Sequence, residues 1–108
     1  MQKLTDYRDS RMLQYPETVS IVIVKDEDGR YNPMSASWVM LTSIEPRMIA
    51  ISIGFERYTY ELMRKQTEFV ISFPSAGMAA EVKLFGSESG RDMDKLKHLG
   101  TPTQPATK

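Results

Sequence analysis

The chain has 108 residues, enough for one domain with a single hydrophobic core. Its 14 basic and 14 acidic residues balance, so the charge gives no reason to expect nucleic acid or an anionic membrane as a partner. Cysteine is absent, which excludes disulfides and thiolate metal sites and fits a reducing cytoplasm. No apolar run approaches the roughly 20 residues of a membrane span, so we expect a cytoplasmic protein.

The first half of the chain predicts three antiparallel strands. Residues 19–24 are β-branched and apolar on both faces, which indicates a central, buried strand. Asp28-Gly29 then favours a hairpin. A second strand is expected over residues 35–43 and a third over 47–53, each following the previous one in a meander.

Short helices and one more strand are expected in the second half. Thr59 is a candidate N-cap for a helix that runs to about Gln66. Residues 68–73 favour a strand, and residues 78–85 favour a helix with Gly86 as its C-terminal stop.

The last predicted helix is short and charged. Asp92 is expected to cap it and Gly100 to end it, with Lys95 lying toward its C-terminal end. Residues 101–108 are rich in Pro and Thr and are expected to form a flexible tail of the one domain, which spans 1–108.

This order of elements predicts an α+β fold with an antiparallel sheet. Four strands leave the edges of the sheet open, and a closed barrel needs more strands than these. Either a second copy of the chain covers the edges, as in a homodimer, or part of the fold is missing.

The usual catalytic constellations are absent from the sequence. His98 is the single histidine, and its place near a helix end favours a surface role over catalysis. With no cysteine and one histidine, a transition-metal site is not expected. No phosphate loop of standard spacing occurs either. We therefore predict no catalytic side chain and no metal.

Hydroxyls and cations instead recur where strands meet helices. Ser35 and Ser37 lie on the predicted second strand. The entrance of the first helix carries Arg57, Tyr58 and Thr59, and the segment before the last helix, which contains Lys95, carries Ser87, Ser89, Gly90 and Arg91. Taken singly, each is more often a cap or surface residue than a ligand contact. Their recurrence at two junctions favours a pocket for an anion, because helix N-termini offer unpaired N–H groups.

Trp38 admits two interpretations. A lone tryptophan in a small domain usually belongs to the core, where its N–H finds a partner. Its place on the strand that carries Ser35 and Ser37 would equally let it border a planar ring.

An ordered series of motifs resembles the flavin reductase-like family of FMN-binding split barrels, and within it the flavoredoxins. The matching segments are "YPETVSIVIVKDEDGRYNPMSASWVMLTSIEP", "RMIAISIGFERYTYELMRKQTEFVISFP" and "VKLFGSESGRDMDKLKHLG". They agree with the family in order and spacing from about Tyr15 to Gly100. Each segment alone is a weak signal, and the set is fairly specific.

The resemblance implies a cofactor and a site. It implies a split barrel, an FMN cofactor, and electron transfer from NAD(P)H or a redox partner protein through FMN to an acceptor. It also implies that a set of residues surrounds the flavin ring and its ribityl phosphate: Asn32, Ser35, Ser37, Trp38, Arg57, Thr59 and Lys95.

The chain departs from the family in its extent. Family members continue beyond this segment with further strands and flavin contacts, so we expect a truncated form of the fold. The alternative to a flavoprotein is a non-catalytic remnant or dimerisation module that has lost the flavin.

Overall fold

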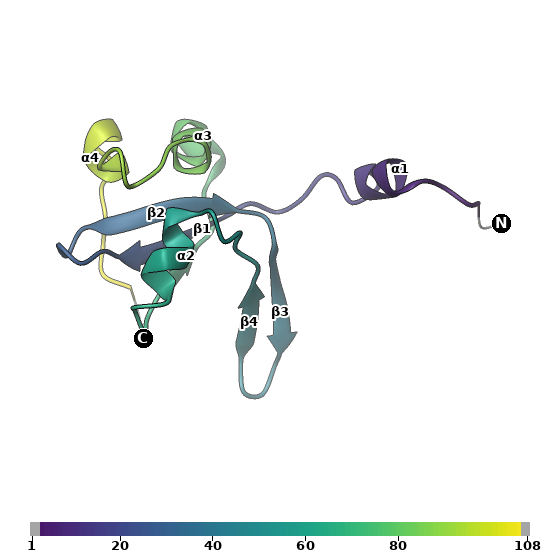
Figure 1. The fold of residues 1–108 in the computed structure, drawn as a ribbon, viewed down its shortest axis with the longest axis horizontal. Helices are drawn as coiled ribbons and strands as arrows, with labels where there is room; N and C mark the ends of the chain where they lie inside the picture. The colour runs from purple at the N-terminus through teal and green to yellow at the C-terminus, as the bar shows by residue number, and fades with distance from the viewer. Residues whose placement is uncertain (1–2, 107–108) are drawn as a thin grey trace.

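The computed structural model describes residues 3–106 (Figure 1). It has an α+β fold with antiparallel sheets and short helices, as the sequence predicts. The elements are, in chain order, α1 (Tyr7–Met12), β1 (Ser20–Lys25), β2 (Tyr31–Ala36), β3 (Val39–Ser43), β4 (Met48–Ile51), α2 (Tyr58–Met63), β5 (Val70–Ser72), the 3-10 turn η1 (Ala76–Met78), α3 (Ala79–Ser87) and α4 (Lys95–Leu99). Within the described residues, none of these helices has the length and apolar character needed to cross a bilayer.

The main sheet has the strand order β2–β1–β5, with both pairings antiparallel. β1 lies at its centre with Val22 and Val24 fully buried, which confirms the predicted central strand. Gly29 adopts a φ of 82° in the turn between β1 and β2, and the Asp28-Gly29 hairpin is thereby confirmed. β5 is shorter than the strand expected over 68–73.

β3 and β4 form a separate hairpin that projects from the main body (Figure 1). The single strand expected over 35–43 is wrong, because the chain leaves the sheet at Ser37 and Trp38 before β3 begins. The N–H of Val39 donates to the Ser37 carbonyl at 3.0 Å, and this tight turn redirects the chain. β2 therefore does not pair with β3, the continuous meander does not form, and the split barrel stays a prediction.

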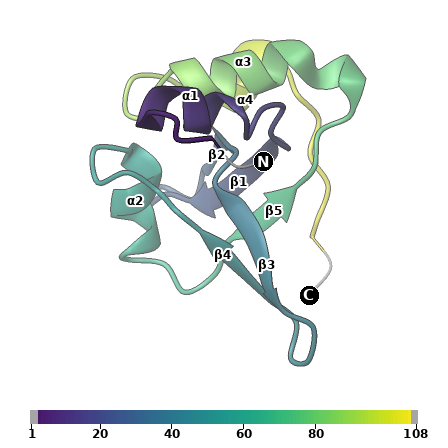
Figure 2. The ribbon, with the colours of Figure 1, turned by 90° about the vertical axis from the view of Figure 1, so that its right-hand side faces the viewer.

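Helices cover both faces of the main sheet (Figure 2). Ser35 and Val22 occupy neighbouring positions of the β1–β2 register, so their side chains point to opposite faces. Val22 and Val24 pack with Leu62 of α2 on one face. On the other face, the Ser35 hydroxyl donates to the Val82 carbonyl of α3 at 2.7 Å.

Two predicted helix caps are wrong. Arg57 is the N-cap of α2 and makes no side-chain cap bond, whereas Thr59 is buried inside the helix. α4 begins after Asp94, whose carboxylate accepts an N–H of the first turn, and not after Asp92. Lys95 is consequently the first residue of α4 rather than lying toward its C-terminal end.

The glycines near the helix ends have different roles. Gly86 lies inside α3 rather than ending it, and a Cβ there would meet the Ser35 Cβ at 3.4 Å. The absent side chain thus lets α3 pack closely on β2. Gly100 ends α4 with a φ of 63°, as predicted. α1 has no counterpart among the predicted elements, and none of its residues is buried.

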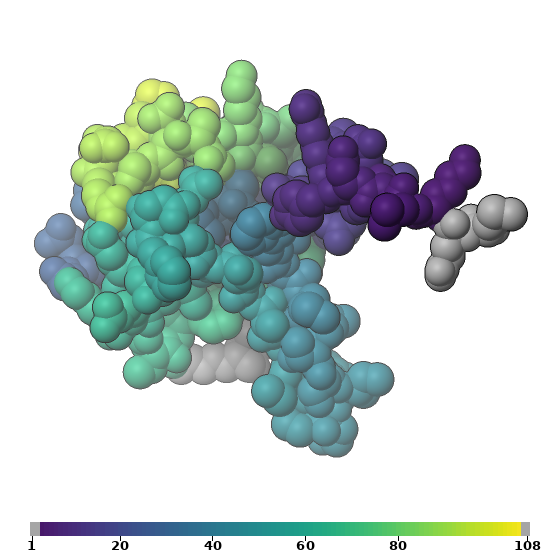
Figure 3. All heavy atoms as spheres, turned by 45° about the vertical axis from the view of Figure 1, so that its right-hand side comes forward, coloured from purple at the N-terminus to yellow at the C-terminus, as the bar shows by residue number. Residues whose placement is uncertain are grey.

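The chain exposes more surface than a compact monomer of its mass. Its accessible area is 8866 Å², against about 6,100 Å² for a typical monomer of 12.3 kDa. α1 and the β3–β4 hairpin both project from the body (Figure 3). Large apolar side chains are exposed on these two projections: Leu4, Tyr7, Met12, Leu13, Met40, Leu41, Ile44 and Met48.

Candidate functional site

A cavity of about 160 Å³ lies at the β2 edge of the main sheet. It opens between the start of α2 and the segment that joins α3 to α4. Its lining consists of Asn32, Met34, Glu56, Arg57, Tyr58, Thr59, Phe85, Ser87, Glu88, Ser89, Gly90, Arg91 and Lys95. This volume is well below the roughly 300–1,000 Å³ of sites for drug-sized ligands, so the cavity suits one small group such as a phosphate rather than a whole flavin.

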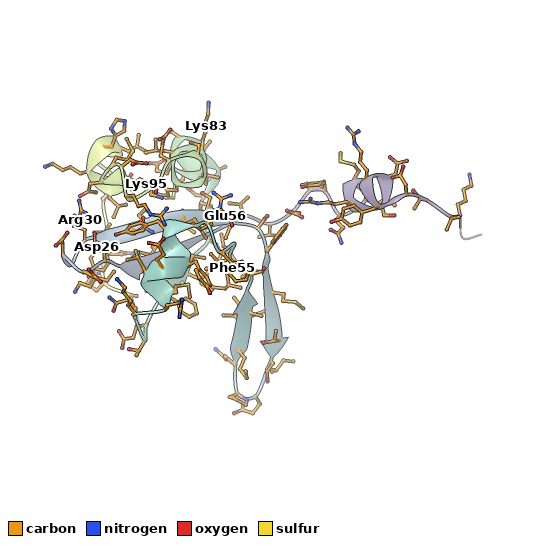
Figure 4. All side chains as sticks on the ribbon, in the orientation of Figure 1. Asp26, Arg30, Phe55, Glu56, Lys83 and Lys95 are labelled. Carbon is orange, nitrogen blue, oxygen red and sulfur yellow. The ribbon has the colours of Figure 1, made fainter. Side chains whose placement is uncertain are left out.

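Four predicted site residues come together in this cavity, although they belong to distant parts of the sequence. Asn32 comes from β2, Arg57 and Thr59 from the start of α2, and Lys95 from the start of α4. Figure 4 shows Lys95 on the side of α4 that faces β2, with Glu56 close to the entrance of α2. Contact of these residues with a flavin remains a prediction.

Asn32 and Thr59 form a buried pair. The Asn32 amide Nδ2 donates to the Thr59 hydroxyl Oγ1 at 3.0 Å, and both residues are buried. Thr59 lies inside α2 rather than at its N-cap, so its hydroxyl serves this tertiary contact instead of a cap. Asn32 Oδ1 is also buried and has no hydrogen-bond partner among the described residues. A buried acceptor of this kind is costly unless a ligand or water satisfies it.

Lys95 is a buried cation in the cavity wall. Its Nζ donates to the Glu88 carbonyl at 3.2 Å and to the Phe85 carbonyl at 3.4 Å. The pKa of Lys95 is lowered to about 8, mainly by burial and also by the positive charge of Arg57, whereas Glu88 opposes the shift. An ammonium has three donors, so one N–H of Lys95 remains for an anion.

Two arginines stand at the rim of the cavity. Arg57 Nε lies 3.6 Å from the Glu56 carboxylate, and both side chains are more than half exposed. Arg91 pairs with Glu61 and lies over the Tyr58 ring, with 5.2 Å between Cζ and the ring centroid. With Lys95, these residues place three cations around one small space.

Gly90 lies unusually close to Asn32. A Cβ at Gly90 would meet Asn32 Oδ1 at 2.1 Å, closer than Cβ atoms come to other atoms in proteins, and Tyr58 Cδ1 at 3.0 Å, a tight contact. The glycine therefore lets the α3–α4 segment close over the cavity.

The other three predicted residues do not line this cavity. The Ser35 hydroxyl is already bonded to α3, and Ser37 lies in the turn after β2. Trp38 is 56% exposed, so the interpretation of Trp38 as a core residue is wrong. Its indole stands at the exit of β2, where the chain leaves the sheet and cannot bury it.

Sequence reasoning missed part of the lining. Glu56 and Glu88 look like ordinary surface carboxylates in the sequence, and Met34 and Phe85 look like core residues. Arg91 is different, because the sequence already places it with Gly90 among the polar groups before the last helix, in the "SGRDMDK" motif.

Comparison with known proteins bears directly on this site. Residues 12–108 match the family described as flavin reductase like domain. The structure superposes on flavoredoxin of Desulfovibrio vulgaris (Miyazaki F) with a TM-score of 0.81 and 33% identity, covering 93% of this chain and 53% of that one. It superposes on an FMN-binding protein from Thermus thermophilus, solved with bound 1-cyclohex-2-enone, with a TM-score of 0.74 and 31% identity, covering 90% of this chain and 52% of that one.

A curated relative extends the comparison. An uncharacterised protein of Pyrococcus abyssi is 36% identical over 96 residues, which is 89% of this chain and 54% of the relative. The chain therefore spans about half the length of this relative and of the two solved structures. The family match covers most of the chain. This protein belongs to the flavin reductase like domain family.

Proposed function

We propose that this chain is an FMN-binding oxidoreductase module of the flavin reductase or flavoredoxin type. The observation that carries the proposal is the cavity in which Arg57, Thr59 and Lys95 surround one small space, beside the unsatisfied Oδ1 of Asn32. In this role, electrons from NAD(P)H or from a redox partner protein pass through FMN to an acceptor. Membership of the family and likeness to proteins named for FMN binding support the cofactor.

The donors around the cavity fit the phosphate end of FMN. Thr59 Oγ1 accepts from Asn32 and keeps its own proton to donate. Lys95 has one N–H left, and the Arg57 guanidinium supplies a planar pair of donors for phosphate oxygens. Asn32 Oδ1 is an acceptor, which a phosphate dianion cannot satisfy. A hydroxyl of the ribityl chain next to the phosphate would satisfy it.

The flavin would supply the redox chemistry, and the protein would supply binding and orientation. This division accounts for a sequence in which no nucleophile and no acid–base pair stands out. The residues of the cavity would fix the phosphate, and Trp38 would offer an exposed face to the ring. Ser35 and Ser37 lie between the cavity residue Asn32 and Trp38 in the chain, and we propose them as further contacts to the flavin.

Reconstitution with FMN tests the proposal. The purified chain is incubated with excess FMN and desalted, and its visible spectrum is recorded. We expect a retained flavin spectrum, and bleaching when NADH or NADPH is added without oxygen. Loss of all flavin on desalting would defeat the proposal for this chain and favour the alternative, a remnant or dimerisation module without flavin.

We also propose that two copies of the chain associate. The accessible area exceeds the value expected for a compact monomer by about 2,800 Å² per chain. Obligate homodimers bury about 2,000–5,000 Å² in total. Burying only part of the excess area of each chain would therefore give an interface of this size. Sedimentation at micromolar concentration tests the proposal, and a single folded monomer would contradict it.

A further inference from the structure

A second cleft lies between α1 and Trp38, apart from the cavity at the edge of β2. Its volume is about 250 Å³, and it is lined by Tyr7, Ser10, Arg11, Gln14 and Trp38. The first four residues recur at spacings of three and four, so they form one face of the N-terminal helical segment. That face and the indole are the two walls of the cleft. Figure 1 shows α1 projecting from the body on the side where β2 ends and the chain turns into β3.

The chemistry of the two walls is specific. The Arg11 guanidinium lies over the Trp38 ring, with Cζ 5.7 Å from the centroid. Across residues 3–106 the Arg11 side chain forms no ion pair, so its donors remain available. The Trp38 residue is 56% exposed. A flat apolar surface next to a forked cation suits a planar ring that carries a carboxylate.

We propose that this cleft binds a small aromatic carboxylate, with its carboxylate on Arg11 and its ring against Trp38. The volume is just below the roughly 300–1,000 Å³ of sites for drug-sized ligands, so the cleft suits a single ring. Gln14 and Tyr7 offer an amide and a hydroxyl for a further polar substituent. The binding itself does not depend on the proposed function.

Tryptophan fluorescence tests the binding directly, because Trp38 is the single tryptophan of the chain. The full chain without flavin is titrated with benzoate and, in parallel, with benzamide, a neutral ring of similar shape. We expect a saturable change in emission with benzoate, and binding of benzamide about tenfold weaker because it lacks the charge-assisted hydrogen bonds.

Matched variants identify the residues responsible. Arg11→Ala should weaken benzoate binding about tenfold or more, and Arg11→Lys should fall between this variant and the wild type. Arg8→Ala removes the same charge from an exposed position of α1 outside the cleft and should leave binding unchanged. Trp38→Phe is measured by calorimetry and should bind more weakly. Circular dichroism verifies that each variant is folded.

Three results would overturn the proposal. They are the lack of any saturable change with benzoate, equal affinity for benzoate and benzamide, and equal loss in the Arg8 and Arg11 variants. Because the titrations contain no flavin, a failure of FMN reconstitution leaves the benzoate result standing. The opposite pattern, FMN bound and benzoate not, overturns this site alone.

Discussion

The Asn32 amide donates to the Thr59 hydroxyl at 3.0 Å, and the two residues lie 27 positions apart in the chain. The bond joins β2 to α2 in the interior, since both side chains are buried. Thr59 is therefore an internal tie between two elements as well as a candidate ligand contact. The two roles can be separated by choice of substitution.

Thr59→Val keeps the shape of the side chain and removes the hydroxyl. Asn32 Nδ2 then stays buried without an acceptor, and we expect a loss of about 1–3 kcal/mol in the free energy of unfolding. Urea denaturation measures this change. Thr59→Ser keeps the hydroxyl and should lose less stability and less FMN affinity. Equal stability of Thr59→Val and the wild type would show that the tie contributes nothing.

Arg57→Ala should weaken FMN binding by about one to two powers of ten, because a charge-assisted hydrogen bond contributes about 1.5–3 kcal/mol. Riboflavin, which lacks the phosphate, should lose much less affinity. Arg64→Ala is the matched control, since Arg64 is exposed at the other end of α2 and lies outside the cavity. Fluorescence titration of each variant with both flavins gives the comparison. An equal loss for FMN and riboflavin argues against a phosphate contact.

Lys95 should make both stability and ligand binding depend on pH. Burial lowers its pKa in the folded protein to about 8, below the usual 10.5. Between these values the unfolded chain binds more protons, so the free energy of unfolding should rise with pH across this window. FMN affinity should fall over the same range, because the neutral amine loses its attraction for phosphate.

Lys95→Met is the reference for both effects. It keeps much of the side-chain volume and removes the titrating group, so its stability should lack the rise, on the order of 2 kcal/mol, that we expect for the wild type between pH 8 and 10.5. Denaturant midpoints and FMN titrations across the pH series provide the measurements. Parallel pH curves for the two proteins would show that Lys95 does not titrate in this window.

Gly90→Ala should open the cavity. The added Cβ would overlap Asn32 Oδ1, only 2.1 Å away, so the α3–α4 segment must move at a cost of about 1–3 kcal/mol. FMN affinity should fall as well, because the α3–α4 segment no longer closes over the cavity. Gly77→Ala is the control, because its Cβ would lie 3.9 Å from the Ser75 Oγ, an ordinary contact. Retained FMN affinity in Gly90→Ala would show that the close approach does not shape the site.

The sequence correctly predicted those features of the fold that depend on neighbouring residues. The β-branched run of β1, the glycine of the first turn and Gly100 at the end of α4 all behave as their sequence signals indicate. Each of these signals reflects either a local backbone preference or burial on both faces of a strand. Both can be read from neighbouring residues, without knowledge of a distant partner.

Features that depend on distant partners were predicted less well. The residue type of Thr59 favours a cap, but in the structure Thr59 lies inside α2 and its hydroxyl bonds to Asn32 of β2. The break at Trp38 separates two sheets, and nothing in the alternation of residues marks it. Four of the seven predicted site residues share one cavity, because the family motifs carry this long-range information, while propensity does not.

The candidate site also has a consequence for folding. Its polar groups come from β2, α2 and α4, which are joined by long stretches of chain, so the cavity exists only when the whole domain is assembled. An anion that binds there stabilises the fully folded state alone. In hydrogen exchange, saturating ligand should therefore slow the amides of β1, at the centre of the sheet, as much as those of α2, although β1 contributes no side chain to the cavity.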